Sequence, residues 1–226
     1  MLKVKSKKDL EIKIESIPKH TNPKIELEQY STPATIAADV LWNAYILGDI
    51  DDKNVLDLGS GTGIFTIGSA LLNAKCSVGM DVDKGSIDLA IKTVNSMGIN
   101  NCKFLNEDLS LFNDISFDRS SKSITNGLLN SVDTIIQNPP FGSQYMGKRG
   151  SDRVFIQIAM SLSPVIYSFH MSKTENFLNS YFKDLGGNIT HKFLYDFSIP
   201  KIHDFHTKDS KSIQVIVLRV ENGKFL

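Results

Sequence analysis

The distribution of apolar and polar positions predicts strands and helices that alternate along the chain. Short apolar runs of strand length are separated by longer segments in which apolar residues recur at helical spacing. The expected strands span residues 54–58, 76–80, 103–105, 132–136, 163–169, 189–197 and 213–220. The expected helices span residues 64–72, 84–97, 151–162 and 174–184. Gly98 and Gly186 mark the ends of two of these helices.

This alternation is typical of a mainly parallel sheet that carries helices on both faces. The last two strands follow each other without an intervening helix, which favours an antiparallel C-terminal hairpin at one edge of the sheet. The sequence therefore predicts a Rossmann-like α/β fold.

Two segments depart from the alternation. Residues 110–131 are polar and rich in Ser and Asn, so we expect a surface insertion or loop before the fourth strand. Residues 1–28 begin with four lysines in a partly alternating pattern and continue with Pro18 and Pro23. This pattern predicts an N-terminal arm, either an added strand or an irregular extension, in front of one domain that spans residues 29–226.

Composition and charge exclude several classes of protein. The chain has 226 residues, is 41% hydrophobic and carries 25 basic and 25 acidic side chains, which is ordinary for a globular domain. Its apolar runs are far shorter than the roughly 20 residues of a membrane span, and no secretory signal is evident. A cytoplasmic location is the expectation. The two cysteines lack any metal-binding spacing, so no metal site is expected.

The turn after the first strand has the sequence Asp57-Leu58-Gly59-Ser60-Gly61-Thr62-Gly63. Glycine at every second position lets the backbone turn sharply and approach a ligand closely, while the next helix presents free N–H groups. A nucleotide-like ligand fits such a turn. Dinucleotide dehydrogenases usually need G-x-G-x-x-G, with one residue more before the third glycine than this chain has.

Acidic residues stand at the ends of the next two strands. Asp81 follows the second strand, where a carboxylate can accept both hydroxyls of a ribose. Asp108 follows the third strand, within reach of an adenine ring. Each acid alone is typical of a helix N-cap or a solvated side chain. Together with the glycines they predict one cleft, because ligands of such sheets bind at the carboxyl ends of the strands.

The fourth strand runs into Asn138-Pro139-Pro140-Phe141. Two prolines make the turn rigid, so it can aim the Asn138 side chain. The amide carbonyl of Asn138 and the backbone carbonyl of Pro139 are acceptors that can grip an –NH2 group, while Phe141 offers a face for stacking a base. Taken alone the motif is an ordinary loop breaker, and its position at this strand end makes it the acceptor side of a cleft.

These motifs, in this order, resemble those of the class I S-adenosylmethionine-dependent methyltransferases that methylate amino groups. More narrowly, residues 27–33 (LEQYSTP) followed by residues 138–142 (NPPFG) resemble the methyltransferase-like protein 5 family, whose members methylate N6 of an adenosine in small-subunit ribosomal RNA, and its archaeal relatives. The resemblance extends from about residue 27 to residue 220. It implies an enzyme with a class I methyltransferase fold.

The resemblance also implies the cofactor and its contacts. S-adenosylmethionine would be held from the N-terminal side by Gln29 and Thr32, and its ribose would bind Asp81. Asp108 and Leu109 would contact its adenine. The turn would hold its methionine and ribose end through Asp57, Gly59, Gly61, Thr62, Gly63 and Ile64. Asn138, Pro139, Pro140 and Phe141 would form the catalytic turn.

Basic residues near the catalytic turn and in the last hairpin are candidates for binding RNA phosphates. They are Lys148, Arg149, Arg153, Lys201, His206 and Lys208. For the hairpin, a solvated surface loop is an equal alternative. The resemblance further implies a partner, a small zinc-binding methyltransferase activator protein that pairs with the edge strand near Phe104, although that strand is equally consistent with an ordinary protected edge.

Other functions remain open from the sequence alone. The same Asn-Pro-Pro turn serves guanine N2 in RNA, adenine N6 in DNA and, with Tyr in place of Phe, a glutamine amide in proteins; Phe141 favours a nucleobase. An NAD-dependent oxidoreductase would need the longer glycine motif and an acid or base near the nicotinamide. A non-catalytic scaffold is disfavoured by the intact Asn138 and Asp81.

Overall fold

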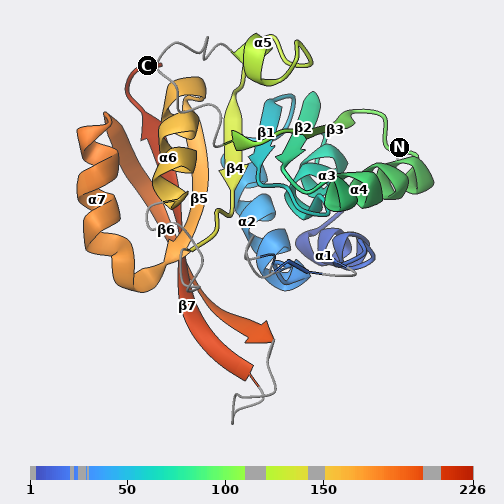
Figure 1. Cartoon of the computed structure of the whole chain (residues 1–226), viewed down its shortest axis with the longest axis horizontal. Coiled ribbons are helices and arrows are strands. Elements are labelled where there is room, and N and C mark those ends of the chain that lie inside the picture. The colour runs from blue at the N-terminus through green and yellow to red at the C-terminus, as the bar shows by residue number, and fades with distance from the viewer. Residues whose placement is uncertain are drawn as a thin grey trace.

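A mixed sheet forms the centre of the protein, shown in Figure 1 as a computed structural model. The structure describes residues 4–20, 23–24, 29, 31–109, 121–141, 151–200 and 210–225. Within these ranges the strands are β1 (Asn54–Leu58), β2 (Cys76–Asp81), β3 (Cys102–Asn106), β4 (Thr134–Gln137), β5 (Val165–Met171), β6 (Gly187–Pro200) and β7 (Ser210–Asn222). They form one seven-stranded sheet of order β3-β2-β1-β4-β5-β7-β6.

Strands β1 to β5 are parallel, and β7 runs antiparallel to both β5 and β6. The predicted parallel sheet and its antiparallel C-terminal hairpin are therefore confirmed. Figure 1 shows the far part of this hairpin projecting beyond the rest of the molecule.

Helices cover both faces of the sheet, as expected. One face carries α1 (Lys7–Glu15), α2 (Ala34–Ile46), α3 (Ile64–Leu71) and α4 (Lys84–Met97), and the other carries α5 (Ser121–Ile124), α6 (Ser151–Leu162) and α7 (Glu175–Asp184), which follows the 3-10 turn Ser172–Thr174. Successive strand residues point to opposite faces, so Val55 lies in the first core and Leu56 in the second. Both faces of β1 are thus buried.

The N-terminal arm contains a helix where a strand was one expectation. Ser6 caps α1 by accepting the Asp9 N–H, and Leu10 and Ile14 are buried against α2 and α3. Helix α2 was not predicted at all. It begins after Pro33, whose fixed φ of −56° suits a helix start, and its buried residues occupy more than one face, so a single apolar stripe is missing.

Two other expectations concern the loop before β4 and the membrane. Residues 110–120 of the expected insertion lie outside the described residues, and the short helix α5 follows them. Over the described part of the chain, every helix is too short or too polar to cross a membrane.

A buried ion pair joins the loop after α2 to the C-terminal half of the sheet. Asp49 accepts hydrogen bonds from the Arg219 guanidinium at 2.7 and 3.1 Å and from the Tyr167 hydroxyl at 2.6 Å. The side chains of Asp49 and Arg219 are each 8% exposed. Removing Asp49 would leave the buried Nε and Nη2 groups of Arg219 and the Tyr167 hydroxyl without this acceptor, although Arg219 Nη1 keeps its ion pair with Glu221 at 2.7 Å.

Replacing Asp49 by Ala is therefore expected to lower the free energy of unfolding by about 3–5 kcal/mol. Urea denaturation followed by circular dichroism measures this change. Asp88→Ala is the matched control, because Asp88 forms an exposed ion pair with Lys84 on α4, and it should cost less than about 1 kcal/mol. Equal losses for the two variants would contradict the role given to Asp49.

Candidate cofactor and acceptor site

The sheet register brings the ends of four strands to one edge. Leu58 at the end of β1 lies opposite Met80 of β2 and Gln137 of β4. The residues expected at the site lie at or just after these strand ends, namely Gly59, Asp81, Asp108 and Asn138. The predicted gathering of the glycine turn, the acids and the proline turn at the carboxyl ends of the strands agrees with this register.

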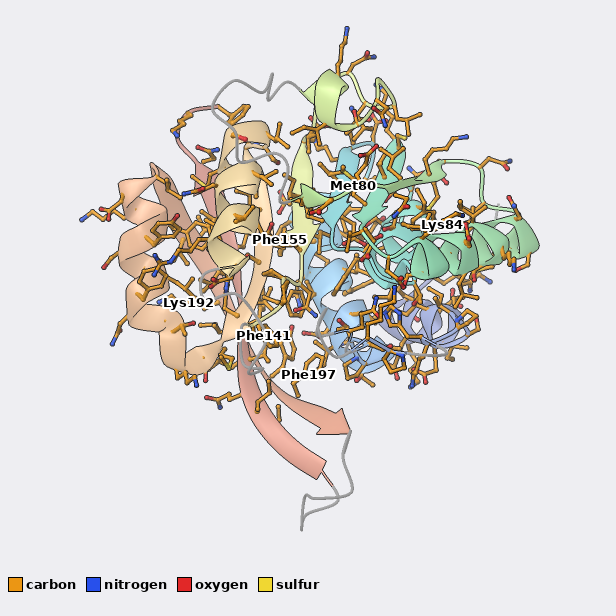
Figure 2. All side chains as sticks on the ribbon, in the orientation of Figure 1. Met80, Lys84, Phe141, Phe155, Lys192 and Phe197 are labelled. Carbon is orange, nitrogen blue, oxygen red and sulfur yellow. The ribbon has the colours of Figure 1, made fainter. Side chains whose placement is uncertain are left out.

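Three glycines in the turn after β1 adopt left-handed backbone conformations. Gly59, Gly61 and Gly63 have φ values of +75°, +53° and +91°, which side chains with a Cβ rarely adopt. The N–H groups of Gly59 and Ser60 both donate to the Met80 carbonyl at 2.9 Å. Met80, labelled in Figure 2, therefore fixes the start of the turn from the neighbouring strand.

Aromatic side chains from distant segments fill the space beside the turn. A Cβ on Gly63 would lie 2.6 Å from the Phe104 ring of β3, and a Cβ on Gly59 would lie 3.3 Å from the Phe155 ring. Phe155 points from α6 toward this end of β1 (Figure 2). Sequence reasoning missed Phe155, because no local pattern links α6 to the glycine turn.

Asp57 lies beneath the turn rather than at its surface. It is 1% exposed, and its Oδ2 accepts the Thr66 N–H at 3.0 Å and the Thr66 hydroxyl at 2.6 Å. Burial raises the pKa of Asp57 to about 7, against the hydrogen bonds from Thr66, which lower it. Its other oxygen has no partner among the described residues. The carboxyl thus ties β1 to α3.

Asp81 holds the turn from the other side. Its Oδ2 accepts the Gly61 N–H and its Oδ1 accepts the Asp83 N–H, both at 2.8 Å. Burial raises the pKa of Asp81, and these two hydrogen bonds oppose the rise. Each carboxylate oxygen can accept more than one hydrogen bond, so Asp81 can also take ligand hydroxyls.

The segment before α2 reaches the start of α4. The Lys24 ammonium lies 2.6 Å from Asp83 Oδ1, and Gln29 Oε1 accepts the Lys24 N–H at 2.8 Å. Asp83 also caps α4 by accepting from Ser86. Gln29 is therefore close to the strand end that carries Asp81, on the N-terminal side where a cofactor contact was expected.

The proline turn contacts a residue that is distant in the sequence. Asn138 is half-buried, and its Nδ2 donates to the Thr32 hydroxyl at 3.1 Å. Thr32 itself is 6% exposed. Pro139 is buried, while Pro140 and Phe141 are half-buried, and Phe141 packs against the core under α1 to α4. The amide of Asn138 is thus fixed through its nitrogen, which leaves its oxygen as an acceptor.

The remaining expected cofactor contacts lie on or beside the same strand ends. Asp108 is half-buried, Leu109 is buried in the second core, Thr62 is 8% exposed and Ile64 begins α3. Their contacts to a cofactor stay predictions.

The expected RNA-binding residues are only partly described. Arg153 is exposed on α6, with its guanidinium carbon 4.9 Å from the centre of the Phe177 ring on α7. Lys148, Arg149, Lys201, His206 and Lys208 lie outside the described residues.

The residues at this edge fit an adenosine-containing cofactor. The turn places three glycines with positive φ at the strand ends, and Asp81 offers a carboxylate for a ribose diol. Across the described ranges no cluster of His, Cys, Asp and Glu could hold a metal ion. The arrangement can therefore hold a nucleoside beside the Asn138 amide, whose oxygen can accept a hydrogen bond from an amine.

The chain is similar to several known proteins. The family model of the ribosomal protein L11 methyltransferase (PrmA) matches residues 43–137. The chain is 38% identical to an uncharacterized protein of Methanocaldococcus jannaschii, covering 97% of this chain and 95% of that protein. It is 32% identical to the rRNA N(6)-adenosine-methyltransferase METTL5 of Danio rerio, covering 94% and 97%. The crystal structure of protein PH1948 from Pyrococcus horikoshii has a TM-score of 0.78 and 34% identity, and the match covers 96% of both chains.

The raised pKa of Asp57 predicts a specific dependence of stability on pH. A carboxyl whose pKa is higher in the folded than in the unfolded chain stabilises the fold at low pH, and this contribution is lost as the pH rises through the folded value. For Asp57 the window runs from about 3.8 to about 7. Asp57→Asn removes the titration, so the variant should gain stability relative to wild type across this window, by about 1.4 kcal/mol per unit of pKa shift.

Urea denaturation of both proteins at several pH values between 4 and 8 tests this expectation. The difference in free energy of unfolding should grow with pH and level off above about 7. Parallel stability curves for the two proteins would contradict a buried, protonated Asp57.

Proposed function

Because the chain belongs to the METTL5 family of rRNA N6-adenosine methyltransferases, we propose that it transfers a methyl group from S-adenosylmethionine to N6 of an adenosine in ribosomal RNA. Relatives named for this activity in Danio rerio and Drosophila melanogaster are 32% and 30% identical over nearly their whole length. The single structural observation that carries the proposal is the contact between Asn138 and Thr32 at the end of β4.

This contact supports a defined role for the Asn138 amide. Its Nδ2 donates to Thr32 Oγ1, so its carbonyl oxygen is the atom that can accept a hydrogen bond from an incoming amine. The Pro139 carbonyl is the second proposed acceptor. An amine whose two N–H bonds are held by acceptors keeps its lone pair directed at the methyl group. Bound S-adenosylmethionine supplies that methyl in an already electrophilic form.

The other site residues are proposed to hold the cofactor in line with the amine. Asp81 binds the ribose, Asp108 and Leu109 contact the adenine, and Gln29 closes the site from the N-terminal side. The glycine turn with Thr62 and Ile64 contacts the methionine end. Asp57 supports this turn from below through Thr66, which is an indirect role.

The hydrogen bonding of the turn favours this cofactor over NAD. In dinucleotide-binding folds the glycine-rich turn donates N–H groups to a pyrophosphate. Here the Gly61 N–H is donated to Asp81 and is therefore not free for a pyrophosphate, whereas the acid itself is common to both kinds of site. A ribose diol and a sulfonium cation are both compatible with such an acid, so methyl transfer is favoured over hydride transfer.

Phe141 is proposed to stack on the target adenine. A base inside a folded RNA must leave its stack before a methyl group can reach it. Arg153, and Lys148, Arg149, Lys201, His206 and Lys208 outside the described residues, are proposed phosphate contacts around this base. The cytoplasmic location expected from the sequence stays a prediction.

Methylation of total RNA with labelled S-adenosylmethionine, followed by nucleoside analysis, tests the proposal. N6-methyladenosine in the small-subunit rRNA is the expected product. Asn138→Ala should reduce turnover by about 10²–10³-fold, a loss comparable to that of one preorganised polar contact to the reacting group. Binding of S-adenosylmethionine, measured by calorimetry, should change little.

Gln157→Ala is the matched control, because Gln157 is exposed on α6 and its side-chain amide donates to the Tyr181 hydroxyl of α7 at 3.0 Å. It should methylate RNA at the wild-type rate. A methylated guanine, or full turnover by Asn138→Ala, would overturn the assignment of base or of residue.

We further propose that a small zinc-binding activator protein pairs with β3. This strand is the outermost strand on one side of the sheet, and its Lys103 and Asn106 are exposed. Phe104, which was expected at an exposed edge, instead turns inward onto Gly63 and Gly79. Main-chain pairing along β3 is thus the proposed contact, with Leu105 as its half-buried apolar neighbour.

Gel filtration of the protein with such an activator should show a stable one-to-one complex. Asn106→Pro should weaken the complex. The Glu107 N–H donates to the Asp81 carbonyl of β2, so alternation along the strand turns the Asn106 N–H away from β2, and proline removes it. Asn106→Ala is the matched control, because it removes the same side-chain contacts to the Asp81 and Val82 carbonyls but keeps the backbone N–H. Separate elution of the two wild-type proteins would contradict the proposed partner.

A further inference from the structure

A histidine of the N-terminal arm lies directly on the glycine turn. His20 follows α1 in the chain and is half-buried. Its Nδ1 lies 3.0 Å from the Ser86 hydroxyl at the start of α4, and its Nε2 lies 3.2 Å from the position that a Cβ on Gly61 would occupy. The imidazole therefore spans from α4 to the turn that Asp81 holds.

The hydrogen bonds around His20 define its tautomer. The Ser86 hydroxyl donates to Asp83 Oδ2 at 2.6 Å, so Ser86 Oγ is left to accept from the ring N–H at Nδ1. Burial lowers the pKa of His20, against the charges of Asp81 and Asp83, which raise it. A neutral ring with its proton on Nδ1 carries a lone pair on Nε2, and this nitrogen faces the turn.

We infer that His20 is a further cofactor-binding residue whose Nε2 accepts a hydrogen bond from a ribose hydroxyl of the cofactor. The inference rests on the proposed function, and specifically on Asp81 as the ribose ligand. A ribose presents two neighbouring hydroxyl donors, and Asp81 already accepts two backbone N–H groups. His20 adds a second acceptor close to Asp81, from a different segment of the chain.

The position of the His20 ring also explains why residue 61 is glycine. A side chain there would meet His20 Nε2 at 3.2 Å and would have to adopt a φ of +53°. The His20 ring therefore requires glycine at position 61. It lies where it can contact a ligand bound at the glycine turn.

Calorimetric titration with S-adenosylhomocysteine, and with its 2′-deoxy and 3′-deoxy analogues, tests the inference. His20→Phe keeps a ring of similar size but removes both nitrogens, so it should bind S-adenosylhomocysteine about tenfold more weakly, the loss of about one hydrogen bond. For the analogue that lacks the bonded hydroxyl, His20→Phe and wild type should bind equally. His20→Gln, which keeps a polar group in reach, should recover part of the loss.

Lys19→Ala is the control variant, because Lys19 is the exposed neighbour of His20 and pairs only loosely with Glu15, at 3.8 Å. It should bind S-adenosylhomocysteine like wild type, and melting temperatures without ligand should verify that every variant is folded. Unchanged affinity in His20→Phe overturns the inference. An equal loss for S-adenosylhomocysteine and both deoxy analogues also overturns it, because it indicates packing alone. A wild-type protein that binds no S-adenosylhomocysteine contradicts the proposed function instead.

Discussion

The glycine-rich turn after β1 is the constraint on which the rest of the site depends. At each of its three left-handed glycines an added side chain would meet a ring from another segment, namely Phe155, His20 or Phe104. Phe104 belongs to the core under α1 to α4, whereas Phe155 belongs to the core under α6 and α7. The two cores therefore meet at this turn, and its shape is a property of the whole fold.

The two acids beside the turn have different roles: Asp57 supports the turn, and Asp81 is the proposed ligand of the ribose. Asp57 is buried beneath the turn, where it accepts a hydrogen bond from the Thr66 N–H. Asp81 is only half-buried and accepts a hydrogen bond from the Gly61 N–H of the turn. The charge of Asp81 contributes to the raised pKa of Asp57, after the larger effect of burial. Neighbouring carboxyls disfavour an anion and suit hydroxyl donors or a cation. The acceptor turn, by contrast, depends on a neutral amide tied to Thr32.

The sequence predicted what local patterns encode. The strands β1, β2 and β4 and the turns that follow them were placed within a few residues, because glycine, proline and alternating apolar residues act locally. Helix α2 was missed since its small apolar residues leave no polar stripe. The burial of Asp57 was also missed, although it alternates with Leu56 and Leu58 and so shares the face of Val55. Contacts such as that of Phe155 with Gly59 join distant segments, and no single stretch of sequence carries them.

The strand order has a consequence for how the chain reaches its folded state. The last strand, β7, lies between β5 and β6 in the sheet, and β6 pairs with no other strand among the described residues. Strand β6 therefore cannot join the sheet until the final strand has been synthesised. Contacts of high sequence separation are slow to form, so we expect the pairing of β7 with β5 to be a late step of folding, and β6 to enter the sheet only through β7.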